Sequence, residues 1–140
     1  MPEDVPSFAA LHRYARKHLG AAAYPRDYHP WRVYGCPECG TVPLTLRIEH
    51  HTGSTPPDFR GVVYARCTVC GEERRIFGFT GAHRRREREE HPTCRCGASA
   101  FYVAQLDRIE SGEMAGFYDE GVIVGQCASC GAHRVFVNMD

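Results

Sequence analysis

The sequence predicts a small β-rich protein that is stabilised by metal and built from two copies of one module. Three observations lead to this prediction. The 140 residues include 8 cysteines, which occur in four close pairs. A glycine follows each pair, and the segments between the pairs alternate apolar and polar residues as half-buried strands do. Paired cysteines in a chain of this kind favour bound metal, with a disulfide framework as the alternative.

Residues 1–35 are expected to form an N-terminal amphipathic helix followed by a loop. Within 7–20 the apolar residues recur at helical spacing, Ser7 can cap the start, and Gly20 can end the helix. The stretch 21–35 is rich in aromatic residues and prolines, so we expect an ordered loop that wraps the sheet.

The cysteines divide into two sets that repeat along the chain. A shift of sixty positions aligns residues 61–77 with 121–137, including the closing cysteine pair of each set. An internal duplication explains this match. The first set comprises Cys36, Cys39, Cys67 and Cys70, and the second comprises Cys94, Cys96, Cys127 and Cys130.

Each module has the same expected order of elements. A cysteine turn leads into a strand, and a loop then leads to a second strand, a second cysteine turn and a final strand. Residues 43–50 carry the clearest alternation, with leucine or isoleucine at every second position from Leu44 to Ile48. Glycine after each pair suits a tight turn in which both thiols face one ion, because its last residue favours φ > 0.

This arrangement resembles the zinc-ribbon family over residues 36–79 and 94–137. The resemblance implies two tandem zinc ribbons, each a three-stranded antiparallel sheet with a four-cysteine site between two turns. It also implies two structural Zn²⁺ ions per chain, held by the two cysteine sets. The predicted organisation is therefore an N-terminal segment (1–35), a first ribbon (36–79), a charged linker (80–93) and a second ribbon (94–140).

The second set departs from the family pattern, because Cys94 and Cys96 have only one residue between them. Gly97 and the strand expected after it still match the other turns. Two alternatives follow: either both cysteines bind through a tighter turn, which we expect, or His91 replaces one of them.

The linker 80–93 is expected to contain a short charged helix. Thr80 or Gly81 could start it, Pro92 stops it, and its arginines and glutamates recur at helical spacing. A solvated helix is the expected role, and a phosphate site formed by its arginines is the alternative.

Charge bears on the choice of partner. The chain has net charge +0, but residues 1–90 carry 14 Arg and Lys against 11 Asp and Glu, and residues 91–140 carry 3 against 6. We therefore expect any nucleic acid to contact the N-terminal two-thirds. The candidate contact residues are Arg47, Arg60, Tyr64, Arg66, Arg74, Arg75, Arg84, Arg85 and Arg86.

Three classes of function compete. The first is a non-catalytic accessory module that binds nucleic acid or a nucleoprotein machine of transcription or translation, the role in which similar ribbons recur. The second is a protein–protein adaptor or structural subunit, which neutral charge and two rigid modules would suit. The third is rubredoxin-like electron transfer with iron, which the absence of an acidic balance disfavours.

No catalytic motif, small-molecule substrate or membrane contact is expected. The sequence contains no HExxH or GxxxxGK pattern and no Ser/His/Asp arrangement that stands out. Its first eight residues are acidic and lack an apolar run, so we expect neither a signal peptide nor an anchor, and a cytoplasmic location with reduced thiols.

Overall fold

The strands form one eight-stranded antiparallel sheet. The structure is a computed structural model, and it describes residues 8–23, 25–53, 59–78, 85–109 and 120–139. Its elements in chain order are α1 (Phe8–Leu19), the short 3₁₀ helix η1 (Ala21–Ala23), β1 (Trp31–Val33), β2 (Leu44–His51), β3 (Gly61–Cys67), β4 (Glu73–Gly78), β5 (Arg86–Glu90), β6 (Phe101–Arg108), β7 (Glu120–Cys127) and β8 (His133–Met139).

The N-terminal helix and the repeated strands lie where the sequence predicts them. Helix α1 buries Leu11 and Ala15, and the expected cap at Ser7 lies outside the described residues. Gly20 ends the helix with φ 71°, a left-handed conformation that glycine adopts without strain. Strands β2, β3 and β4 and strands β6, β7 and β8 form the two expected three-stranded arrays.

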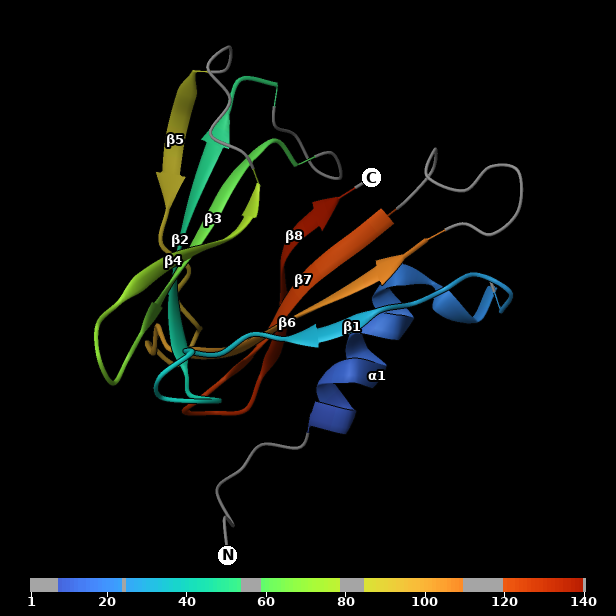
Figure 1. Ribbon diagram of the computed structural model, residues 1–140, viewed down its shortest axis with the longest axis horizontal. Helices are drawn as coiled ribbons and strands as arrows, with labels where there is room; N and C mark the ends of the chain where they lie inside the picture. Colours follow the sequence, from blue (N-terminus) through green and yellow to red (C-terminus); the bar gives the residue numbers. More distant parts are fainter. Residues whose placement is uncertain (1–7, 24, 54–58, 79–84, 110–119, 140) are drawn as a thin grey trace, which may run out of the picture.

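The sheet divides into two halves whose strands pair with each other at a single position. The first half-sheet consists of β5, β2, β3 and β4, and the second consists of β1, β6, β7 and β8. Only the pair Leu44–Phe101 joins β2 to β6, and from there the halves diverge as the two arms seen in Figure 1. Leu44 also pairs with Cys67, and Phe101 pairs with Cys127. The two residues at the junction therefore occupy equivalent positions in the two halves.

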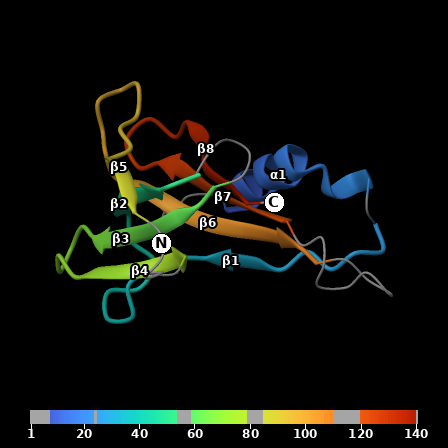
Figure 2. The same ribbon diagram turned by 90° about the horizontal axis from the view of Figure 1, so that it is seen from above.

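The halves exchange one strand each. Strand β1 precedes the first cysteine turn but pairs with β6, where Trp31 faces Leu106. Strand β5 precedes the second cysteine turn but pairs with β2, where Glu89 faces Glu49. Figure 2 shows both pairings from above. Each half is therefore completed by a strand that leads into the cysteine turn of the other.

The expected linker helix is wrong for the part of the linker that is described. Residues 86–90 form a strand, and residues 80–84 lie outside the described part. Tertiary pairing overrides the helical charge spacing, because β5 satisfies backbone groups along the edge of β2. On β5, Glu90 lies 2.9 Å from His50 Nε2, and Glu89 lies near the guanidinium of Arg47. The loop expected at 21–35 likewise contains η1 and β1.

The main core lies between the two halves. Leu46 and Ile48 of the first half-sheet belong to the same buried cluster as Val103 and Ile123 of the second. Phe101 and Phe136 meet edge to face, with ring centroids 5.0 Å apart. The burial of this face by both halves explains the alternation of buried and partly exposed residues along β2 from Leu44 to Glu49.

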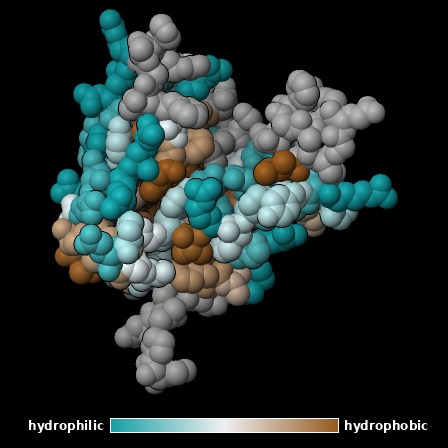
Figure 3. Space-filling model, viewed as in Figure 1, coloured by the Kyte–Doolittle hydropathy of each residue, from teal (hydrophilic) through white to brown (hydrophobic). Residues whose placement is uncertain are grey.

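The outer faces of the two halves differ. The second half-sheet is apolar there and packs against α1. In the first half-sheet the corresponding face carries Arg47, Glu49 and Tyr64, and the surface over this half is largely hydrophilic in Figure 3. The buried residues between α1 and the second half-sheet are Leu11, Ala15, Ala104, Leu106, Val122 and Val124.

Candidate metal centres

Each set of four cysteines forms a compact cluster of sulfur atoms. Within each set the four Sγ atoms lie within 4.8 Å of one another, and all eight cysteines are free thiols. The first centre consists of Cys36, Cys39, Cys67 and Cys70, and the second of Cys94, Cys96, Cys127 and Cys130. Either centre could hold one metal ion.

The ends of the central strands position the sulfurs. Cys67 ends β3 and Cys127 ends β7, and each is followed by a tight turn into the next strand. In these turns a glycine N–H bonds the carbonyl of the first cysteine, at 2.9 Å for Gly71 and 3.0 Å for Gly131. Both glycines have φ 79°, as a turn of this kind requires.

The short turn of the second centre keeps the same closing bond. Gly97 N–H bonds the Cys94 carbonyl at 2.8 Å, as Gly40 N–H bonds the Cys36 carbonyl at 2.8 Å in a turn one residue longer. Gly97 has φ 94°, and both Cys94 and Cys96 contribute sulfurs to the cluster. The alternative ligand His91 is exposed, and its Nε2 lies 2.8 Å from a Glu89 carboxylate oxygen.

The sulfur separations fit a tetrahedral thiolate site. The separation is 3.7 Å for Cys36 and Cys70, 3.5 Å for Cys94 and Cys130, and 3.6 Å for Cys96 and Cys127. Zinc–sulfur bonds of about 2.3 Å at tetrahedral angles place sulfurs about 3.8 Å apart. The donor set and its spacing therefore fit Zn²⁺.

Backbone donors favour the thiolate form of one cysteine in each centre. The N–H groups of Cys70 and Val69 point at the Cys67 sulfur and lower the pKa of that thiol to about 7. Burial acts against ionisation of Cys127, but the N–H groups of Cys130 and Ser129 outweigh it and bring the pKa to about 6. Metal binding needs thiolates, so these bonds prepare the sites for a cation.

Arg47, predicted as a nucleic-acid contact, lies at the middle of a charged cluster. Its guanidinium lies 2.8 Å from Glu49, 2.8 Å from Glu73 and 3.7 Å from Glu89. The hydrogen bond from Arg47 lowers the pKa of Glu73 below its ordinary value. The Arg47 guanidinium also lies 4.0 Å from the centre of the Tyr64 ring, so it occupies the ring face that a base would need.

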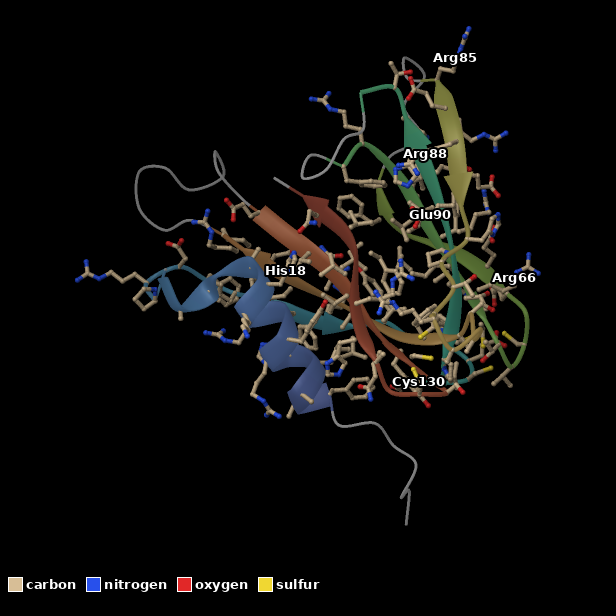
Figure 4. The ribbon with its side chains drawn as sticks, turned by 180° about the vertical axis from the view of Figure 1, so that it is seen from behind. His18, Arg66, Arg85, Arg88, Glu90 and Cys130 are labelled. Atoms are coloured by element: carbon tan, nitrogen blue, oxygen red, sulfur yellow. The ribbon has the colours of Figure 1, made fainter. Side chains whose placement is uncertain are left out.

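The other predicted contacts are spread along the first half-sheet. Arg74 pairs with Glu72 at 2.7 Å, and Arg86 pairs with Glu89 at 3.2 Å. Arg60 is exposed and has an interaction partner, and Arg84 lies outside the described residues. Arg66, Arg75 and Arg85 are exposed and form no ion pair with the described residues. Figure 4 shows Arg66 and Arg85 far apart, near opposite ends of this half.

Sequence reasoning missed the charged residues beside the second centre. Arg95, His133 and Arg134 border a groove there together with Cys94 and Cys130. The repeat could have revealed this difference in charge. A shift of sixty positions aligns His133 with Glu73, an acidic residue of the first module.

No helix among the described residues is both long and apolar enough to cross a membrane. Comparison of the chain with models of protein families, with curated proteins and with solved structures yields no match.

Proposed function

We propose that the protein is a non-catalytic binding module made of two tandem zinc ribbons, each held by one structural Zn²⁺. The observation that carries this proposal is the pair of four-sulfur clusters, with sulfur separations of 3.5 to 3.7 Å. Four protein ligands fill the coordination sphere of zinc and leave no position for a substrate. In each module the ion would join the cysteine turn before the first strand to the cysteine turn between the second and third strands.

Elemental analysis of the chain, purified and dialysed under reducing conditions, tests this proposal. We expect two zinc ions per chain, no colour and fully reduced cysteines, in keeping with a cytoplasmic protein. Visible charge-transfer absorption would indicate iron and a rubredoxin-like role. Four disulfides in place of metal would refute the proposal.

Of the two partner classes, the charge distribution favours a protein. The outer face of the first half-sheet presents paired charges of both signs, centred on Arg47 and Glu73, and no helix covers it among the described residues. Such a surface has little net field with which to attract phosphates, whereas mixed charges suit a complementary protein surface. The protein would then act as an adaptor or structural subunit.

A charge-reversal experiment tests the adaptor role. The double variant Arg66→Glu/Arg75→Glu changes this face, and Arg32→Glu on β1 serves as the matched control on the other half. After affinity purification of the full chain, we expect a stoichiometric protein partner with wild type and the control, and its loss with the double variant. Equal recovery with all three would contradict the assignment of this face.

Nucleic acid remains the second candidate because Arg66, Arg75 and Arg85 are exposed and form no ion pair with the described residues. Binding through them would release counterions, so affinity for single- or double-stranded RNA or DNA should fall steeply as salt rises. Absent or salt-independent binding would eliminate this candidate.

A further inference from the structure

The two metal centres differ at positions that the repeat makes equivalent. The shift of sixty residues pairs Glu72 with Ala132 and Arg74 with Arg134. In the first module the Glu72 carboxylate lies 2.7 Å from the Arg74 guanidinium. In the second module, alanine replaces the carboxylate at this place.

The ion pair borders a small space beside the first centre. That space has a volume of about 20 Å³ and is lined by Cys36 and Cys67 together with Glu72 and Arg74. It has room for about one water molecule. A reagent larger than water therefore has little room in this space, although Cys70 is exposed elsewhere in the first centre.

Beside the second centre, Ala132 and Arg134, the equivalents of Glu72 and Arg74, line an open groove of about 530 Å³. Cys94 and Cys130 line it, and Cys130 is exposed at the turn between β7 and β8 (Figure 4). Its charged lining is cationic and includes Arg95 and Arg134 but no carboxylate. Arg134 donates instead to the Thr93 carbonyl, at 3.1 Å, which holds its guanidinium beside the groove.

We propose that the second centre is an oxidation site, at which a hydroperoxide converts Cys94 and Cys130 into a disulfide and the bound zinc leaves, while the first centre keeps its metal. The metal part of this inference rests on the proposed zinc sites. The two sulfurs lie 3.5 Å apart, so the second thiolate can reach the first after oxidation without rearrangement of the strands.

The chemistry needs only the peroxide as oxidant. One thiolate attacks an oxygen of the peroxide, the O–O bond breaks, and a sulfenic acid forms as hydroxide leaves from hydrogen peroxide, or alkoxide from an organic hydroperoxide. The other thiolate then attacks this sulfur, the S–O bond breaks, and hydroxide leaves as the disulfide forms. The two sulfurs lose two electrons in total and the peroxide gains them, and zinc departs because only two thiolate ligands remain.

The cationic lining favours both steps. Each step expels hydroxide or alkoxide, and guanidinium groups beside the sulfurs stabilise the negative charge that develops on that oxygen. In the first module Glu72 would neutralise this help from Arg74. Access and electrostatics thus point to the same centre.

A reciprocal exchange of the two groove residues tests the proposal. Ala132→Glu should recreate the ion pair with Arg134 and narrow the groove, and Glu72→Ala should open the space beside the first centre. Neither residue is a sulfur ligand, and both are exposed. The full chain is treated with hydrogen peroxide, zinc release is followed with a chromogenic chelator, and mass spectrometry of peptides identifies the oxidised cysteines.

In the wild-type chain we expect one zinc to leave first, together with a Cys94–Cys130 disulfide. Ala132→Glu should slow that release about tenfold, and Glu72→Ala should speed release from the first centre. Simultaneous loss of both ions, earlier oxidation of the first centre, or release rates that neither substitution changes would overturn the proposal.

Peptide mapping also separates this inference from the zinc assignment, because thiol oxidation can be followed in metal-free chain. There, earlier formation of the Cys94–Cys130 disulfide than of any disulfide in the first centre would support the oxidation site even if no zinc were bound. The reverse order would overturn it whatever the metal content.

Discussion

Replacement of one ligand in the second centre should unfold the first half-sheet as well as the second. We consider Cys127→Ser, which removes a sulfur from the end of β7. A structural zinc site contributes on the order of 10 kcal/mol to folding. A whole domain is typically stable by only about 5–15 kcal/mol, so loss of most of one site consumes most of that stability.

Loss of the second centre should destabilise the first half-sheet because each half contains a strand that leads into the cysteine turn of the other. Strand β5 completes the first half-sheet but leads directly into the turn at Cys94. In the other direction, the Tyr34 N–H donates to the Val103 carbonyl at 2.9 Å, so the second half also holds the segment that enters the first centre. Neither half has its full set of strands without the other.

The assay compares zinc content with amide hydrogen exchange in β2 and β3. We expect Cys127→Ser to retain well under one zinc per chain and to lose protection in both halves. Ser129→Ala, in the same turn but not a ligand, should keep two ions and full protection. A Cys127→Ser chain that binds one zinc and keeps protected amides in β2 and β3 would refute the coupling between the halves.

Three further substitutions test packing and charge, each measured as a change in the free energy of unfolding from denaturant titration. Arg47→Ala should destabilise the chain by about 2 kcal/mol, because Glu49 and Glu73 both lose the guanidinium that lies 2.8 Å from each; an unchanged midpoint would contradict this. Gly61→Ala should cost about 2 kcal/mol or more, since its Cβ would lie 1.8 Å from the Glu49 carbonyl oxygen and push β2 and β3 apart; a neutral effect would be inconsistent with the register. Arg108→Met should cost about 3 kcal/mol, because Asp27 and Glu120 both lose an ion pair with the buried guanidinium, which lies 2.9 Å from each; an unchanged stability would argue against the burial of this arginine.

Local patterns were enough to predict the six strands of the two repeated arrays and the two sulfur sets. Alternation from Leu44 to Ile48 reflects one buried and one outer face, and this periodicity needs no knowledge of the partner strands. The cysteine spacing similarly encodes turns whose glycines take φ > 0, and the structure brings the sulfurs of each set together. The pair Cys94 and Cys96 fits because its turn loses one residue and keeps its closing hydrogen bond.

The exchange of β1 and β5 could not be predicted in the same way. Residues 86–90 carry charges at a spacing that also suits a helix, and their strand pairing depends on the free edge of β2, which is distant in sequence. For the same reason the loop predicted at 21–35 hides a strand, β1, on which Trp31 lies opposite Leu106. Pairing between distant segments is a tertiary property, and local propensity carries little information about it.

Charge neutralisation limited the prediction of the binding surface. The sequence predicts Arg47 and Tyr64 as nucleic-acid contacts, but the fold stacks them together and surrounds the arginine with carboxylates. These carboxylates come from β2, β4 and β5, so their convergence follows from strand order and not from spacing along the chain.

The number and identity of the bound ions test the central claim most directly. Native mass spectrometry and elemental analysis of the reduced full chain should give two zinc ions per molecule, both lost on addition of a strong chelator with loss of the folded state. A folded chain with no bound metal, or one that keeps its fold after complete zinc removal, would contradict the claim that the two four-cysteine centres hold this protein together.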